Sequence, residues 1–287
     1  MKTKQLLRLT ASLYNKPHLI TQSSFESIAQ YLDSRNHSLM KFEESDSENP
    51  KDDDPEEDGY DPVIGIGVIP VYGALTYKPV AGMCGDVGCS YSSILSDASE
   101  MIEDGVTCIV LDCDSGGGEG YGVFECATEL RKMCDDAGVK IYAYNDGCMA
   151  SACYGLACVA DEVISNPFAE TGSIGVLISL VNDSKALEQE GYTRTFITAG
   201  ASKVPFAEDG SWREGFLEDL QASVDNLYDS FSQHVSDYTG LSVEAVKGTE
   251  AKMFSSAAAL ELGLVNKVMT RSEFTQYVVS KQGATSA

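Results

Sequence analysis

Basic residues, histidine and long apolar runs are all scarce in this sequence. Only 20 of its 287 residues are Lys or Arg, against 44 Asp or Glu, which gives a formal net charge of -24. Phosphate backbones are held by clustered Lys and Arg, so this balance argues against a nucleic-acid partner. No window approaches the roughly 18 consecutive apolar residues of a membrane span, so we expect a soluble protein without a membrane partner.

The sequence also lacks the cysteine spacings of a metal site or a disulfide scaffold. Its nine cysteines include no CxxC pair and have no histidine near them. We therefore interpret them as small buried hydrophobes in a reducing cytoplasm, and expect neither a metal nor a cofactor. Of the three histidines, His18 and His37 precede the expected folded domain, and His234 is expected on a helix surface. None is placed for a Ser-His-Asp triad.

Composition divides the chain into four parts. Residues 1–40 contain "FESIAQYL", whose helical spacing of apolar residues predicts an N-terminal helical segment. Residues 41–62 hold eleven Asp or Glu against two Lys, with three prolines, and are expected to be a disordered acidic linker. Residues 63–275 have the alternating apolar and amphipathic segments of a folded domain, and residues 276–287 are expected to be a C-terminal tail.

The folded domain alternates short β-branched runs with amphipathic segments, which predicts an α/β fold. Strands are expected at 63–73, 108–111, 140–145, 162–166, 174–179 and 193–198. Helices are expected at 91–105, 122–138, 151–160 and 183–192, followed by a long one at 213–240. Such alternation indicates a mainly parallel sheet covered by helices, with a long C-terminal helix packed on it or on a neighbouring subunit.

Three features follow expected strands, where open parallel sheets place their functional sites. The first is "DCDSGGGEGYG", residues 112–122. Consecutive glycines let backbone N–H groups approach a substrate, as an oxyanion hole requires. A glycine-rich turn also suits phosphate, but the run lacks the Lys-Ser/Thr ending of a P-loop and the full GxGxxG spacing. A nucleotide site is therefore the weaker interpretation.

The second feature is Ser151, which precedes an apolar helix, and the third is Lys203 in "ITAGASKVPF". Serine is a favoured N-cap residue, so Ser151 alone could serve only to begin the helix. A nucleophilic serine needs a base, and without a suitable histidine the remaining candidate is a lysine, which acts as a base where burial favours its neutral form. Lys203 follows the strand expected at 193–198, whereas Lys185 has the setting of a solvated helix lysine.

Together, "DSGGG", "MASACYGLACVADEVISNPFAETGSIGV" and "AGASKVPF" resemble peptidase family S49, the relatives of signal peptide peptidase A. The resemblance covers about residues 60–270 and implies a ClpP/crotonase-like fold with repeated ββα units, with residues 63–275 as the protease domain. It implies that Ser151 is the nucleophile, that Lys203 is the general base, and that Ser173 orients the lysine amine. The implied oxyanion hole uses Gly117 and Ala152, with Gly118 beside them.

One position departs from the family pattern: Gly116 stands where the family usually has proline, which leaves the hydrogen-bonding register of the loop open. The opening "LLRLTASLYNKPHLITQSSFESIAQYL" together with "IGVIPVYGAL" is similar to tailed-phage head maturation proteases. That similarity implies cleavage of scaffold and coat proteins, self-cleavage, self-association, and a location inside the procapsid in the host cytoplasm. Two alternatives remain: a catalytically inactive relative that serves in assembly, and a crotonase-like acyl-CoA enzyme.

Overall fold

The protein is described by a computed structural model covering residues 16–39, 65–79, 81–82, 85–86, 89–200, 202–207 and 209–283. The linker expected at 41–62 lies outside the described residues, and so does the end of the expected tail, residues 284–287. In the expected N-terminal segment the structure places a strand, β1 (His18–Ile20), followed directly by a helix, α2 (Gln22–Leu39).

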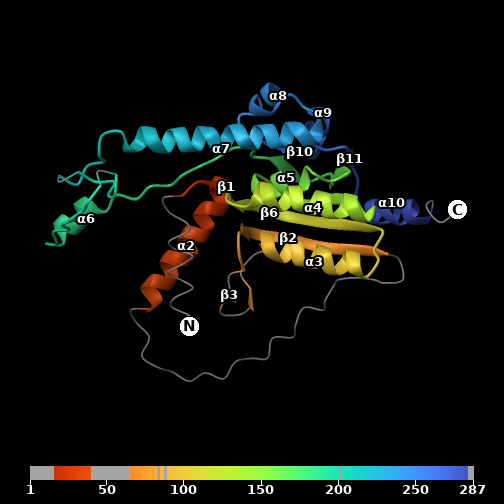
Figure 1. Ribbon diagram of the computed structural model, residues 1–287, viewed down its shortest axis with the longest axis horizontal. Helices are drawn as coiled ribbons and strands as arrows, with labels where there is room; N and C mark the ends of the chain where they lie inside the picture. Colours follow the sequence, from red (N-terminus) through yellow and green to blue (C-terminus); the bar gives the residue numbers. More distant parts are fainter. Residues whose placement is uncertain are drawn as a thin grey trace, which may run out of the picture.

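A mainly parallel sheet forms the centre of the molecule (Figure 1). Its order is β10-β9-β7-β6-β2-β5, and β8 pairs with both β7 and β11. Among the described strands of this sheet, the β1·β6 and β10·β9 pairings are antiparallel and the others are parallel. The strands are β2 (Ile66–Thr76), β5 (Cys89–Ser90), β6 (Cys108–Glu119), β7 (Lys140–Ala150), β8 (Glu162–Ser165), β9 (Glu170–Gly172), β10 (Met253–Ser255) and β11 (Lys267–Val268). A separate hairpin joins β3 (Ala81–Gly82) and β4 (Gly85–Asp86).

The expected helices of the domain are present. Those expected at 91–105 and 122–138 lie within two residues of their expected bounds, whereas those expected at 151–160 and 183–192 each end three residues early. The helices are α3 (Tyr91–Glu103), α4 (Val123–Ala137), α5 (Ala152–Ala157), α6 (Ser184–Gln189) and α7 (Phe216–Thr239), followed by α8 (Val243–Lys247), α9 (Ser256–Glu261) and α10 (Arg271–Gly283). The α/β class, the mainly parallel sheet and the long C-terminal helix are therefore confirmed. The helix α10 continues past residue 275, where the domain was expected to end, and its Val278 is buried.

The two faces of the sheet pack into different cores because successive side chains of a strand point to opposite sides. On β6, Ile109, Leu111 and Cys113 join the main core beneath α3, α4 and α5, whereas Cys108 and Val110 face α10. The helix α7 lies above α5 and contributes Phe231 and Val235 to the main core (Figure 1). All five of these β6 side chains are buried, which is typical of a central strand of a parallel sheet.

Two expected strands are wrong. Residues 174–179 form only an isolated bridge, between Leu177 and His18. Residues 193–198 run as irregular chain, and Phe196 and Ile197 there are 50% and 99% exposed. β-branched and aromatic residues stabilise a strand only when a neighbouring strand supplies hydrogen bonds and packing, and within the described chain residues 193–198 have no such neighbour.

Candidate active site

The glycine-rich loop is the last part of β6, held by side-chain hydrogen bonds on both sides. Ser115 Oγ donates to the Gly73 carbonyl at 2.5 Å, which ties the loop to β2. Asp114 Oδ1 accepts from the Cys148 N–H at 3.0 Å, which ties it to the end of β7. The Gly117 N–H donates to Ser115 Oγ at 3.1 Å. Gly117 has φ +101°, a conformation that favours glycine.

Ser151 stands at the junction of β7 and α5 in a backbone conformation that is rare for serine. Its φ of 54° and ψ of -118° lie outside the regions that L-residues ordinarily occupy. Its N–H donates to the Gly172 carbonyl at 2.8 Å, and its carbonyl accepts from the Gly155 N–H at 2.9 Å. The side chain makes no N-cap hydrogen bond to α5. Strain of this kind is kept where surrounding structure enforces it, and it is common at active sites.

The structure brings together three of the residues that the resemblance implies. A β-carbon added to Gly117 would lie 3.0 Å from Ser151 Cβ and 3.1 Å from the backbone nitrogen of Ala152. The Ala152 amide is the first of α5, so it has no carbonyl one turn earlier in the helix to bond. Gly118, one residue further along β6, lies in the ladder between Leu75 of β2 and Leu19 of β1. Ser151 is therefore surrounded by backbone amides and by glycine.

Ser173 is held next to this site from the other side. It follows β9, whose register places Gly172 opposite Ala150 of β7, immediately before Ser151. Its own N–H donates to the Lys252 carbonyl at 2.9 Å, and its φ is 53°. Two residues later, the Gly175 carbonyl lies 3.5 Å from Ser151 Oγ. The segment after β9 thus runs past the serine hydroxyl.

Lys203 is not brought to Ser151 within this chain. It lies on an exposed segment between Ile178 and Gly215, called here the arm, which carries α6 away from the sheet (Figure 1). Its side chain is exposed, and among the described residues no hydrogen bond joins it to Ser151. The expectation that Lys203 emerges from the end of a strand is wrong, because residues 193–198 have no strand to pair with. Lys185 is also exposed, on α6 of the same arm.

The arm has its own local order. Arg194 makes a two-point ion pair with Asp183, at 2.9 and 2.8 Å. The Trp212 ring stacks between Phe206 and Phe216, which joins the end of the arm to the start of α7. In contrast, five large apolar side chains of this region are at least 46% exposed: Val181, Tyr192, Phe196, Ile197 and Leu217. Side chains of this kind become buried if the arm packs against protein.

His234 was expected on a helix surface, and this prediction is wrong. Its ring is 8% exposed and packs among Phe124 and Tyr238. Its Nε2 lies 2.8 Å from the Gly155 carbonyl on α5, so the neutral ring must carry its proton on that nitrogen in order to donate. Burial lowers the pKa of His234 below its usual value, despite this bond. His234 therefore binds α5 through this hydrogen bond, and its Nε2 is not available as a base for Ser151.

A buried amide holds the strands around Ser151, and sequence reasoning missed it. Asn145 Nδ2 donates to the Glu170 carbonyl at 2.9 Å and to Thr171 Oγ1 at 3.0 Å. Its Oδ1 accepts from the Gly147 N–H at 3.2 Å. Asn145 therefore fixes the distance between β7 and β9, the two strands that lead to Ser151 and Ser173. An asparagine inside an otherwise apolar strand, "KIYAYN", is the signal that could have identified it.

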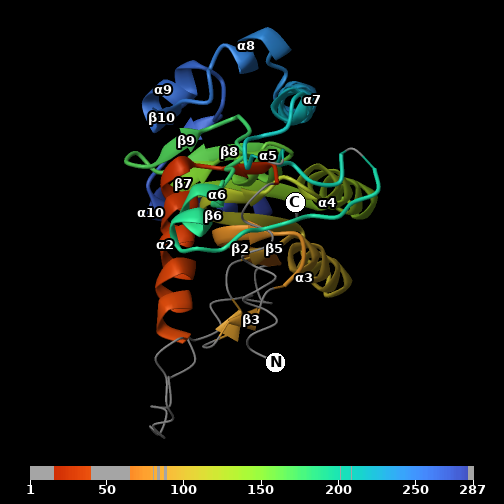
Figure 2. The same ribbon diagram turned by 90° about the vertical axis from the view of Figure 1, so that its left-hand side faces the viewer.

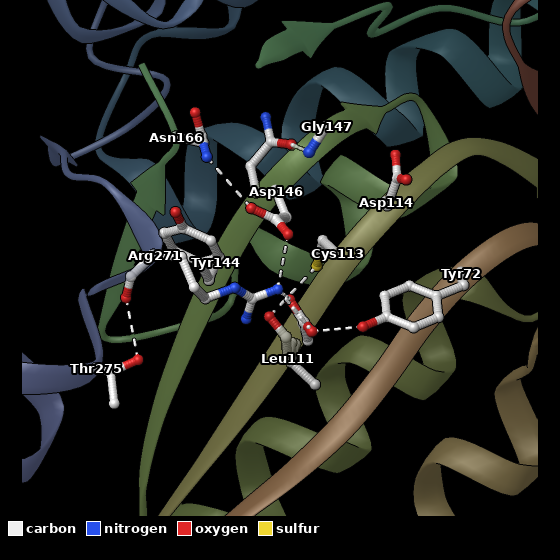
Figure 3. Close-up of polar contacts among 12 residues, drawn as sticks. Tyr72, Leu111, Cys113, Asp114, Tyr144, Asp146, Gly147, Asn166, Arg271 and Thr275 are labelled. Carbon is white, nitrogen blue, oxygen red and sulfur yellow. Dashed lines mark hydrogen bonds and ion pairs between the residues drawn. The ribbon is translucent and has the colours of Figure 1, made fainter. Parts of the chain in front are cut away.

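On the opposite face of the sheet, Arg271 of α10 joins two aspartates (Figure 3). Its guanidinium lies 2.8 Å from Asp112 Oδ1 and 2.9 Å from Asp146 Oδ2, and it stacks over the Tyr144 ring. The Tyr72 hydroxyl donates to the same Asp112 carboxylate. Burial opposes the charge on Arg271, but the hydrogen bonds to both aspartates raise its pKa above the usual value. This cluster anchors α10 to the sheet.

The remaining chemistry-bearing side chains do not form a second site. The eight described cysteines are free thiols, and burial raises the pKa of Cys148, three residues before Ser151, to about 12. In the described part of the chain no three His, Cys, Asp or Glu residues gather as metal ligands would. No helix in that part is both long and apolar enough to cross a membrane. Among the described residues, Ser151 is hydrogen-bonded to backbone groups of Gly155, Gly172 and Gly175.

Comparison with known proteins identifies similar sequences. The model of Peptidase family S49 matches residues 134–284. Head-tail preconnector protein GP5 of Enterobacteria phage P21 is 32% identical over 220 residues, which are 75% of this chain and 42% of that protein. Capsid assembly protease C of Escherichia phage lambda is 34% identical over 219 residues, 75% of this chain and 48% of that protein. This chain thus spans about half the length of these relatives.

More distant similarities extend to cellular proteins. Probable protease SohB of Haemophilus influenzae is 29% identical over 190 residues, 64% of this chain and 53% of that protein. Among solved structures, a ClpP1 variant from Listeria monocytogenes gives a TM-score of 0.46 at 12% identity, covering 72% of this chain and 92% of that one.

Proposed function

Because the chain belongs to peptidase family S49, we propose that it is a serine endopeptidase with Ser151 as nucleophile and Lys203 as general base. The observation that carries the proposal is the conformation of Ser151. A serine that only begins a helix has extended backbone angles and a hydroxyl bonded to the first turn. Ser151 has φ 54° and no such bond, and it lies against Gly117 at the start of α5.

In the proposed reaction, neutral Lys203 takes the proton of Ser151 Oγ as that oxygen attacks a peptide carbonyl. The carbonyl oxygen becomes an oxyanion, which the N–H groups of Gly117 and Ala152 stabilise, with Gly118 shaping the loop. The amine product leaves with the proton from the lysine, and water then hydrolyses the acyl-serine. The Gly117 N–H now donates to Ser115 Oγ, so substrate binding has to replace that bond.

In this structure the Lys203 side chain is exposed on the arm. To act as the base, Lys203 has to move to Ser151. A lysine acts as a base when burial favours its neutral amine, so the arm has to pack against protein. The exposed apolar side chains of the arm support such packing, either against this domain or against a second copy of the chain. Packing against a second copy would be self-association, which we include in the proposal. Ser173 follows Gly172, whose carbonyl accepts a hydrogen bond from the Ser151 N–H. We propose that Ser173 orients the amine of Lys203.

The similarity to the phage P21 and lambda proteins extends the proposal to capsid maturation. In this proposal the substrates are scaffold and coat proteins and the chain itself. Cleavage takes place in the procapsid in the host cytoplasm.

The test is co-expression of the wild-type chain or Ser151→Ala with coat and scaffold proteins, followed by intact-mass analysis of all products. Cleavages that occur only with Ser151 would support the proposal and give the cleavage sites. Intact substrates in both samples would favour the inactive assembly protein instead. Binding of coenzyme A to the purified chain would favour the acyl-CoA alternative.

A further inference from the structure

The nucleophile proposed above is covered in this structure. Ser151 is 0% exposed, so no peptide can reach its hydroxyl unless a neighbouring element moves. The strand β7 pairs with β6 only as far as Ser115 and Met149, and then turns into α5. Beyond that point the edge of β6 that faced β7 would be open. The strand β1 occupies this edge, opposite Gly117, Gly118 and Glu119.

Backbone hydrogen bonds hold β1 on both sides, as they would an inserted strand. On one side β1 is antiparallel to β6, with Leu19 opposite Gly118 and Ile20 opposite Gly117. On the other side His18 and Leu177 exchange two bonds, of 2.8 and 3.0 Å. An extended peptide that adds to a sheet edge makes these same main-chain bonds, and pockets for its alternate side chains give specificity.

The peptide unit after Leu19 lies beside the proposed nucleophile. A β-carbon on Gly117 would stand 2.2 Å from the Leu19 carbonyl oxygen and 3.0 Å from Ser151 Cβ. The Leu19 side chain is fully buried and belongs to the main core. It faces Gly120, where an added β-carbon would lie 3.3 Å from Leu19 Cγ and 3.2 Å from Leu227 Cδ2 of α7. Leu19 thus places a carbonyl at the nucleophile and a side chain in a pocket, as a bound substrate residue would.

The part of the N-terminal segment that follows β1 has fewer contacts with the domain. None of residues 21–30 belongs to the main core. Ile20 and Phe25 form a separate small cluster with Ile28, Ala29 and Leu177. The C-terminal part of α2 projects from the body of the molecule (Figures 1 and 2). The first turn lies against the loop, since a β-carbon on Gly116 would be 2.1 Å from Ser24 Oγ. The chain between this segment and β2 is residues 40–64, so β1 can leave the groove without breaking the β2-β6-β7 order.

We propose that residues 17–21 act as a tethered competitor of substrate, because they occupy the groove between Gly117–Glu119 and Leu177 in which an extended peptide would bind beside Ser151. This inference depends on the proposed function, because it takes Ser151 to be the reacting residue. Substrate is then an extended peptide that binds antiparallel to β6 after β1 has left. An apolar side chain of that substrate enters the pocket that Leu19 fills.

The kinetic test uses the full chain carrying a recognition sequence for a site-specific protease within residues 41–62. A fluorogenic peptide is hydrolysed before and after the cut, with separation of the segment checked by gel filtration. A tethered competitor acts at an effective concentration in the millimolar range. The apparent KM should fall at least about tenfold on release, with kcat unchanged. An unchanged KM after separation, or loss of activity, would overturn the inference.

Point variants test the same competition without the cut. Leu19→Asp should lower the apparent KM of the intact chain, because an aspartate is not stable in the apolar pocket. Glu26→Ala is the matched control, since Glu26 is exposed on α2 and bonds only Gln22 among the described residues. If Leu19→Asp unfolds the protein, as a thermal melt would show, the cut chain still decides the question.

A binding measurement separates this inference from the proposed function. In the Ser151→Ala background, a fluorescent peptide of residues 14–24, YNKPHLITQSS, should bind the released form and fail to bind the uncut chain. The same peptide with Leu19→Asp should bind neither. If this pattern holds and no form hydrolyses peptides, the proposed function fails while the groove stands. If peptides are hydrolysed and the labelled peptide binds neither form, the inference fails alone.

Discussion

The Leu19 carbonyl oxygen and Ser151 Cβ approach the same point above Gly117, at 2.2 and 3.0 Å from where a β-carbon of that glycine would stand. The proposed nucleophile, the glycine of the proposed oxyanion hole and a backbone carbonyl of the N-terminal strand are therefore neighbours. This crowding makes Gly117 a sensitive position for both stability and activity.

Gly117→Ala should combine backbone strain with a collision against the Leu19 carbonyl. The positive φ of +101° and the overlap together should cost about 3 kcal/mol of unfolding free energy, and peptidase activity should fall about 100-fold. Gly105→Ala is the matched control, since its φ is +83° and an added β-carbon meets nothing within 4 Å. Its cost should be about 1 kcal/mol, without loss of activity. Equal effects of the two changes would contradict the role of the contact.

Removal of either proposed reacting group should abolish turnover. Ser151→Ala and Lys203→Ala should each lower kcat at least about 1000-fold, with no further loss in the double variant, because the two residues act as a unit. Lys185→Ala, which removes another exposed lysine of the arm, should retain normal turnover. Peptidase assays on folded protein check this. Near-normal kcat for Lys203→Ala would show that the base is a different group.

Mixing variants tests where the lysine comes from. Neither Ser151→Ala nor Lys203→Ala alone should be active, but a mixture assembled together should regain activity if Lys203 reaches Ser151 of a second copy. The exposed apolar residues of the arm give the reason to expect this contact. Active mixtures at a concentration that supports association would support packing between copies. If wild type is active and mixtures stay inactive despite association, Lys203 reaches its own serine.

The buried His234 should make stability depend on pH. Its pKa is lowered in the folded protein, so below the unfolded value of about 6.5 the unfolded chain binds more protons than the folded one. The free energy of unfolding should therefore fall as pH drops below about 6.5 and be unaffected by this residue at higher pH. His234→Gln, which keeps an N–H donor, should flatten that part of the curve. Denaturant unfolding from pH 5 to 8, with wild type and variant in parallel, measures the difference.

The cluster of Arg271 with Asp112 and Asp146 should stabilise the packing of α10 on the sheet and have little effect on peptidase activity. Arg271→Met leaves the Asp112 carboxylate, which is 6% exposed, without its cation. We expect a loss of about 2 kcal/mol, less than for a fully buried pair because the arginine side chain is 43% exposed. The melting temperature should fall by about 5 °C. The double variant with Asp112→Asn should recover part of the loss, whereas an unchanged melt for Arg271→Met would contradict the anchoring role.

Local pattern predicted much of the domain, because strand and helix signals there agree with the packing. The apolar run at 108–111 does begin a strand, but β6 continues to Glu119, so most of the glycine run predicted as a turn lies inside the strand. Gly117 still lies beside Ser151. The position of His234 could not be read from sequence. A helix with one face on α5 buries residues that its own pattern leaves polar, and the carbonyl of Gly155 that satisfies the ring is 79 residues away.

The N-terminal strand and the course of the arm could not be predicted from the sequence, for a different reason. Three residues, His18–Ile20, form a strand because β6 and Leu177 supply hydrogen bonds on both sides. Partners so distant in the sequence cannot be predicted from the local residue pattern. Conversely, residues 193–198 carry strand-forming side chains without a partner strand in the described chain. The placement of Lys203 depended on that strand, so its position could not follow from the pattern either.

The most direct test of the central claim is digestion of an unfolded protein such as casein by the purified chain, before and after release of the N-terminal segment. Discrete casein fragments are expected with wild type, more of them after release, and none with Ser151→Ala. Equal fragmentation by wild type and Ser151→Ala, or intact casein with both the uncut and the released wild type, would contradict the assignment of Ser151 as the nucleophile of a peptidase.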